Sequence, residues 1–289
     1  MTRRQARVSG QVSAGHQHGS ARLRAVDFLD LMKLESHGPD TWVGVGPKYP
    51  WGGLYGGQIV AQALRAAAHS VDPKLVVHSL HAYFIRRGDH EAPVRYEVDR
   101  VRDGRSFVTR SVVARQSTGA ILNMIASFQL PEQAAEVQTV QAPQVPGPDG
   151  SREATWSKLF DRRSVRRRDL DPADPRACAW FRITGELPDD PLLHACALAY
   201  ISDDLPTEAV IARHPEHVRE PTTPFWNASL DHAIWFHDTL KADAFHLYEF
   251  GCHALRASRG LTIGHVFDAA GKHVATVNQE VLLRQLKKD

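Results

Sequence analysis

The residues that could do chemistry in this sequence include no obvious nucleophilic serine or cysteine. The sequence has no G-x-S-x-G segment, which argues against an α/β-hydrolase. Ser229 stands close to Asp231 and His232, which superficially suggests a catalytic triad. Within one strand, however, these positions point to opposite faces, so we expect Ser229 and His232 not to share a side. If the chain catalyses a hydrolysis, an activated water is then the economical nucleophile.

Asp203 is a candidate for activating such a water, because it follows a strongly apolar stretch. That stretch, residues 192–200, reads LLHACALAY and predicts a deeply buried helix. A carboxylate at the C-terminal end of a helix faces the negative end of the helix dipole, and burial would raise its pKa further. Such a costly placement can mark a functional site, but Ser-Asp-Asp is also typical of a turn. The residues alone leave both interpretations open.

Histidine and cysteine give weaker signals. His78, His81 and His232 fall in strand-like runs and are tempting general bases, yet a histidine in a strand is more often structural. The three cysteines are too few and too scattered for a disulfide framework or a zinc site. The sequence therefore predicts neither a metal nor a cofactor.

Two helices must position these groups, and each is followed by a meander of strands. Gly56 and Gly57 open the first helical pattern, while Asp190 and Pro191 form a start signal for the second. Strand-like runs follow at 76–84, 94–101, 105–115 and 120–129, and again at 227–236, 244–255, 259–267 and 272–284. This repetition indicates an internal duplication. Two such units could pair their edge strands into one long sheet with both helices on its concave face, which is an α+β architecture.

A stretch of low order divides the chain into two units of similar size. Residues 132–152 are rich in Pro, Gln and Gly and are typical of a linker. Residues 1–24 are typical of a flexible basic tail. The expected units therefore cover residues 25–131 and 153–289.

Composition and charge argue against several classes of protein. The apolar fraction of 43% and the charged fraction of 24% are those of a soluble globular protein, and a net charge of +2 is too small to imply nucleic acid. No run of eighteen apolar residues is present, so we expect no membrane-spanning helix. No apolar segment follows the basic N-terminus as a secretory signal would require. These features predict a cytoplasmic protein.

Several blocks of the sequence resemble the acyl-CoA thioesterase II family, the TesB-like double hot-dog enzymes. The matching blocks are GGQIVAQAL (56–64), VHSLHAYFIRRGD (77–89), RDGRSFVTRSVVARQ (102–116), YISD (200–203), SLDHAIWFH (229–237) and VATVNQEVLLR (274–284). The resemblance covers roughly residues 25–285. It implies a double hot-dog fold and hydrolysis of fatty acyl-CoA to fatty acid and CoA, without a cofactor, by a homo-oligomer (dimer or tetramer).

The resemblance also implies a catalytic trio of Asp, Thr or Ser, and Gln that holds a water. The matching residues are Asp203 in YISD, Ser229 before Leu-Asp-His, and Gln279 in the last strand. Where many relatives carry Thr, Ser229 keeps the hydroxyl but lacks the methyl group that restrains its rotamer. Asp204 directly follows Asp203, and only the match to Tyr-Ile-Ser-Asp favours Asp203. The first helix ends in Ala-Ala-His-Ser without a matching acid, which predicts one working site per chain.

Other assignments rest on weaker signals. The backbone amides of Gly57 and Gln58 are candidates for oxyanion donors, because a helix N-terminus favours negative charge. The glycines could equally serve close packing between the helix and the sheet. Leu64, Leu198 and Trp235 are candidates for the wall of an acyl tunnel, and each is equally explicable as core.

Two other functions stay open at this point. A hot-dog enoyl-CoA hydratase or acyl dehydratase would use an Asp/His pair, but no characteristic Asp-to-His loop follows the second helix. A non-catalytic acyl-CoA-binding module is the other alternative, because duplicated folds often keep one degenerate copy. Release of free thiol from acyl-CoA separates the thioesterase from both.

Overall fold

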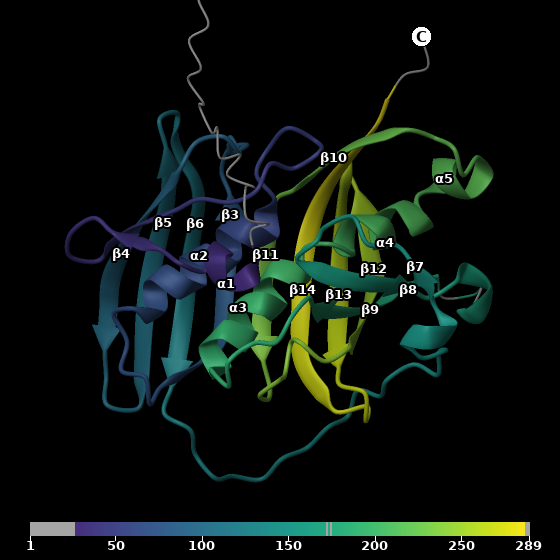
Figure 1. The fold of residues 1–289 in the computed structure, drawn as a ribbon. Helices are drawn as coiled ribbons and strands as arrows, with labels where there is room; N and C mark the ends of the chain where they lie inside the picture. The colour runs from purple at the N-terminus through teal and green to yellow at the C-terminus, as the bar shows by residue number, and fades with distance from the viewer. Residues whose placement is uncertain (1–26, 172, 174, 287–289) are drawn as a thin grey trace, which may run out of the picture.

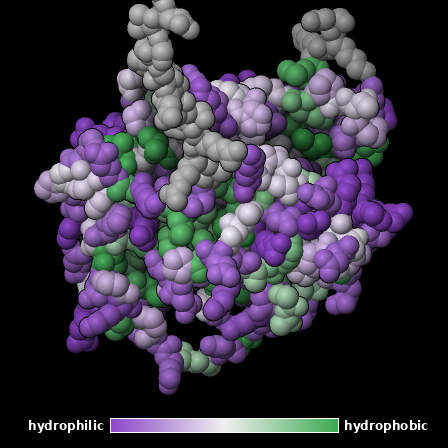
Figure 2. Space-filling view, viewed as in Figure 1, coloured by the Kyte–Doolittle hydropathy of each residue, from purple (hydrophilic) through white to green (hydrophobic). Residues whose placement is uncertain are grey.

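The computed structural model describes residues 27–171, 173 and 175–286. The flexible tail predicted for residues 1–24 lies outside the described residues. No helix in the described part of the chain is long and apolar enough to span a bilayer. Hydrophilic side chains cover much of the face shown in Figure 2, with smaller apolar areas between them.

One antiparallel sheet runs through the molecule, and in the described ranges it contains fourteen strands. The strands are β1 (Glu35–Ser36), β2 (Thr41–Gly44), β3 (Val76–Phe84), β4 (Val94–Asp103), β5 (Phe107–Gln116), β6 (Gly119–Gln129), β7 (Arg152–Glu153), β8 (Phe160–Ser164), β9 (Ala177–Ile183), β10 (Phe225–Ser229), β11 (Asp231–Phe236), β12 (His246–Arg256), β13 (Arg259–Phe267) and β14 (His273–Gln285). Their order is β1-β2-β4-β5-β6-β3-β11-β14-β13-β12-β9-β8-β7, and β10 pairs with β14 beside this path.

The two halves of the chain join at the middle of this sheet. Strand β3 of the first half pairs antiparallel with β11 of the second, with Leu80 opposite Ile234 and Ala82 opposite His232. In Figure 1 the first-half strands lie on the left and the second-half strands on the right, with α2 (Gly56–Ala68) and α3 (Pro191–Ile201) across the sheet. This is the long shared sheet that the internal duplication predicted.

The two central helices are buried because their sequences are apolar where they meet. Every residue of α3 from Leu193 to Ile201 is buried, as its almost wholly apolar sequence predicts. Asp190 caps this helix by accepting a hydrogen bond from the Leu192 N–H, and Pro191 occupies the first turn. Side chains of both helices and of both halves of the sheet form one core cluster.

The remaining helices are short and were not predicted. They are α1 (Phe28–Leu31), α4 (Pro206–Arg213) and α5 (Pro215–Arg219), together with single 3₁₀ turns at Pro148–Gly150 and Arg167–Asp169. The two expected helices and the eight expected strands are observed in their expected order, except that the predicted strand 227–236 is divided at Leu230 into β10 and β11. Strands β1, β2, β7, β8 and β9 were not predicted.

Residues 131–147, within and just before the predicted linker, contain no helix or strand. In Figure 1 this segment passes below the sheet. Hydrogen bonds attach it to the second half: the Gln138 side chain contacts Gly271 and His273, and the Trp180 indole N–H donates to the Pro146 carbonyl. The exact limits of the two units stay a prediction.

Candidate active site

Asp203, Ser229 and Gln279 meet at one point, although they are far apart in sequence. Ser229 Oγ donates a hydrogen bond to Asp203 Oδ1 at 3.0 Å. Gln279 Nε2 lies 3.0 Å from Asp203 Oδ1 and 2.7 Å from Ser229 Oγ. Asp203 follows the C-terminal end of α3, Ser229 ends β10, and Gln279 lies in the middle of β14. Three elements of the second half therefore converge, and a partly exposed Asp203 leaves access for a substrate.

The first half contributes the start of α2 to this site. The Gly57 N–H donates to Asp203 Oδ2 at 2.9 Å, so the carboxylate lies at the positive end of α2 as well as at the negative end of α3. This amide is available because the N-cap residue, Tyr55, makes no side-chain capping hydrogen bond. A Cβ atom at position 57 would lie 2.1 Å from the Tyr200 carbonyl oxygen, so only glycine permits this approach of the two helices.

The surroundings of Asp203 favour its use as a proton acceptor. Burial raises the pKa of its carboxyl group above the ordinary value. Hydrogen bonds from Ser229, Gln279 and the Gly57 N–H oppose this effect without cancelling it. A carboxylate with a raised pKa takes a proton from water more readily than an exposed aspartate does.

His232 contacts the trio through the side chain of Gln279. Its imidazole is fully buried, with Nδ1 2.5 Å from Gln279 Oε1 and Nε2 2.8 Å from Ser202 Oγ. Burial lowers the pKa of His232, which favours the neutral ring. Because the amide oxygen of Gln279 only accepts, Nδ1 must carry the hydrogen, and Nε2 then accepts from the Ser202 hydroxyl. This arrangement turns the Gln279 NH₂ group toward Ser229 and Asp203.

The expectation that Ser229 and His232 lie on opposite faces is wrong. Both contact Gln279, so both point into the same site. The reason is the break at Leu230, where β14 faces β10 and β11 in different registers: Ser229 pairs with Val281, but Ala233 pairs with Asn278. The extra residue in this bulge changes the alternation of faces. No local sequence signal marked the break.

Asp204, the neighbouring acid, points away from the trio. Its Oδ1 accepts from the Trp156 indole N–H at 2.5 Å, and its Oδ2 lies 2.8 Å from Arg162 Nη1. Burial raises the pKa of Asp204 to about 6, although the charge of Arg162 opposes the shift. The geometry therefore places Asp203, not Asp204, with Ser229 and Gln279.

The candidate oxyanion donors and the candidate tunnel residues do not join the trio. Gly57 donates to Asp203 and the Gln58 N–H donates to the Tyr55 carbonyl, so both amides already have partners and this geometry does not support them as oxyanion donors. Leu64 and Leu198 are fully buried in the core. Trp235 is 42% exposed, because its position in β11 points it away from the core, and it cannot line a tunnel beneath the sheet.

Comparisons with known proteins identify the family. A model described as the acyl-CoA thioesterase C-terminal domain matches residues 132–283, and one described as the N-terminal domain matches residues 46–129. Acyl-CoA thioesterase 2 of Haemophilus influenzae is 30% identical over 89% of this chain and 97% of that protein. Acyl-coenzyme A thioesterase 8 of Homo sapiens is 31% identical over 98% of this chain and 97% of that protein.

Solved structures agree with this family and fold. The acyl-CoA thioesterase II TesB2 from Mycobacterium marinum superposes with a TM-score of 0.79 at 36% identity, covering 90% of this chain and 99% of that one. A hot-dog protein from Alicyclobacillus acidocaldarius gives a TM-score of 0.75 at 20% identity, covering 90% of this chain and 98% of that one. At this identity the likeness shows the fold alone. The chain has the double hot-dog fold and belongs to the acyl-CoA thioesterase II family, whose members are thioester hydrolases.

Proposed function

We propose that this protein hydrolyses fatty acyl-CoA to a free fatty acid and CoA by direct attack of a water held by Asp203, Ser229 and Gln279. The observation that carries this proposal is the shared contact at Asp203 Oδ1, where Ser229 and Gln279 both donate hydrogen bonds. Membership in the acyl-CoA thioesterase family supports the substrate class.

Each member of the trio has a distinct role in this mechanism. Asp203 accepts a proton from the water as the water attacks the thioester carbonyl carbon, and the thiolate of CoA then leaves. Gln279 and Ser229 fix the water through hydrogen bonds, and both lie on strands that restrict their movement. In this mechanism Ser229 holds the water and does not itself attack the thioester, so no covalent acyl-enzyme intermediate is formed.

The proposal is tested by thiol release from saturated acyl-CoAs of increasing length. We expect Asp203→Asn to lower kcat by about 10²- to 10⁴-fold, because the proton acceptor is lost. Asp99→Asn, at an exposed position of β4, is the matched control and should keep full activity. Circular dichroism of both variants verifies the fold. An active Asp203→Asn enzyme, or hydroxyacyl-CoA as the product in place of free thiol, would contradict the proposal.

Two expectations accompany this function and stay predictions: a cytoplasmic location and a homo-oligomeric assembly. Exposed apolar side chains on the central strands support the second. Tyr83, Ile125 and Trp235 are 56%, 48% and 42% exposed, on the adjacent strands β3, β6 and β11. Such a grouping of large apolar side chains is typical of a protein–protein contact surface.

A further inference from the structure

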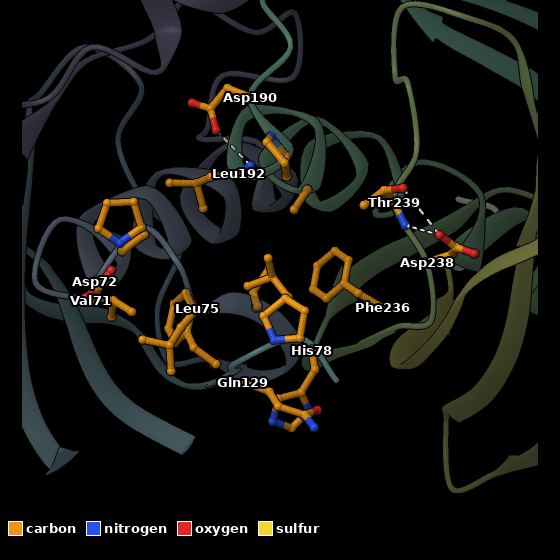
Figure 3. A pocket seen from close by; sticks show the side chains of 18 of the residues that line it. Val71, Asp72, Leu75, His78, Gln129, Asp190, Leu192, Phe236, Asp238 and Thr239 are labelled. Atoms are coloured by element: carbon orange, nitrogen blue, oxygen red, sulfur yellow. Dashed lines mark hydrogen bonds between the residues drawn. The ribbon is translucent and has the colours of Figure 1, made fainter. Parts of the chain in front are cut away.

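A cavity of about 720 Å³ lies at the end of the helix pair away from the trio. It opens between the C-terminal end of α2 and the N-terminal end of α3, and Figure 3 shows side chains from both halves around it. Its apolar lining includes Val71, Leu75, Val77, Phe128, Leu192 and Phe236. Helix α2 has thirteen residues and is therefore about 20 Å long. The cavity lies at its C-terminal end, whereas Asp203 accepts a hydrogen bond from Gly57 at its N-terminal end. Its volume is that of a small-molecule site.

This cavity occupies the position that the internal duplication assigns to a second active site. The trio lies where α2 begins, α3 ends and the interrupted strand β10–β11 passes. The cavity lies where α3 begins, α2 ends and β3 passes. Phe84 of β3 lies beside Gly56 at the start of α2, and Phe236 of β11 lines the cavity at the start of α3. Strand β3 also has a bulge, after Val77, as β10–β11 has at Leu230.

Apolar residues replace the catalytic ones in this second position. Counting from the two bulges, Val77 takes the place of Ser229 and Leu80 that of His232. Opposite Leu80 in β6 stands Ala126, where Gln279 would be required. The inward-facing side chains near the end of β6 are Ala126 and Phe128, and both are apolar.

The helix ends at the cavity also differ from the helix ends at the trio. Ser70 follows the C-cap residue of α2 as Asp203 follows that of α3, but its hydroxyl is engaged by the Ala67 carbonyl and the Arg110 guanidinium. At the start of α3 the Leu192 amide is occupied by its own cap, Asp190. Among the lining residues that the structure describes, none repeats the hydrogen-bonded arrangement of Asp203, Ser229 and Gln279, and the space is left to an apolar ligand.

Polar groups at the rim select the head group of that ligand. Arg65 is the only arginine or lysine among the lining residues that the structure describes, and its Nε is buried without a hydrogen-bond partner. Asp190 lies 3.6 Å from the same guanidinium, and Asp238 is paired with Lys272. Asp72 and Glu132 add negative charge at the opening. This negative charge opposes the several phosphates of CoA more strongly than the single charge of a carboxylate, which the guanidinium of Arg65 can offset.

We propose that this cavity binds one free fatty acid, with the alkyl chain among the apolar side chains and the carboxylate against the guanidinium group of Arg65, whose side chain is 24% exposed. The site is separate from the catalytic trio and performs no chemistry. It goes beyond the hydrolytic function, because it gives the protein a second position that responds to the class of molecule that the reaction releases.

The test is equilibrium dialysis with radiolabelled dodecanoate. Val71→Trp fills the cavity and should remove one bound dodecanoate per chain while keeping thiol release within about twofold, since position 71 lies far from Asp203. Val101→Trp, at an exposed position of β4, is the matched control and should bind as the wild type does. Arg65→Gln should weaken dodecanoate binding by about tenfold and leave dodecanol binding unchanged.

Three results would overturn the inference. These are undiminished dodecanoate stoichiometry in Val71→Trp, equal weakening of dodecanoate and dodecanol by Arg65→Gln, or displacement of the Val71-dependent dodecanoate by CoA alone. If Val71→Trp does not fold, Arg65→Gln with the two ligands still decides the matter. Because the readout is binding, a failure of the Asp203 mechanism would be seen separately, in the thiol-release assay.

Discussion

The hydrogen bonds around Asp203 run in one direction. The Ser202 hydroxyl donates to His232, His232 to Gln279, and Gln279 to Ser229 and Asp203. Each hydrogen bond fixes the orientation of the group that accepts it. The side chains of Gln279, Ser229 and Asp203 are therefore held with their hydrogens and lone pairs already in place. Such preorganisation is what water activation requires.

His232 is expected to position Gln279 rather than to exchange protons with substrate. His232→Phe removes the hydrogen bond to Gln279 Oε1 and should lower kcat by about a hundredfold with little change in KM, since misplacement of a water-holding group costs turnover. His232→Asn can still donate to Gln279 and should recover part of the loss. Steady-state kinetics with a single acyl-CoA distinguishes these cases. Equal activity in the Phe and Asn variants would remove the positioning role.

The pH dependence of turnover should depend on Ser229. Hydrolysis needs the ionised Asp203, so kcat falls as pH falls through the pKa of this carboxyl group, which burial raises. The hydrogen bond from Ser229 favours the charged form, so Ser229→Ala should move the acidic limb of the pH–kcat profile to higher pH. Ser229→Thr keeps the donor and should leave the limb in place. A shift to lower pH in Ser229→Ala would contradict this account.

At the scale of elements, the site depends on the close approach of two helix ends. The start of α2 supplies the Gly57 amide, and the end of α3 supplies Asp203. The bulge at Leu230 adds the third element by turning Ser229 and His232 to the same side. A small change in the distance between these elements should therefore affect both stability and turnover.

Gly57→Ala tests this dependence. The added Cβ would overlap the Tyr200 carbonyl oxygen and force α2 away from α3, so we expect a loss of stability of about 3 kcal/mol and a marked loss of thiol release. Gly147→Ala is the control, since a Cβ there meets no atom within 4 Å and the residue has an ordinary φ of −63°. Urea denaturation measures both variants. Equal midpoints would show that the helices tolerate separation.

At the scale of the whole molecule, one chain contains two related positions with different contents. The sheet joins the two halves through β3 and β11, so each helix begins beside the end of the other. One such junction has Asp203, Ser229, Gln279 and His232, and the other has an apolar cavity. Duplication therefore leaves the second position free to bind without catalysing, because folding needs only that its side chains be apolar and of suitable size.

The sequence by itself determined the two helices, most of the strands and the likeness to a family that points to the trio. Helical and strand periodicity are local properties, and the cap formed by Asp190 and Pro191 is read from adjacent residues. Several matching blocks in order were specific enough to indicate the family, but only the match to Tyr-Ile-Ser-Asp favoured Asp203 over its neighbour Asp204.

Only the tertiary structure decided which groups meet. Whether Ser229 and His232 share a side depends on a bulge formed against β14, about fifty residues away, and alternation within the strand misses it. The partner of the Gly57 amide is a carboxylate on the other helix, and Trp235 faces outward because β11 pairs with β3 and β14 in this register. These outcomes depend on pairing between distant segments, whereas sequence patterns report only the preferences of neighbouring residues.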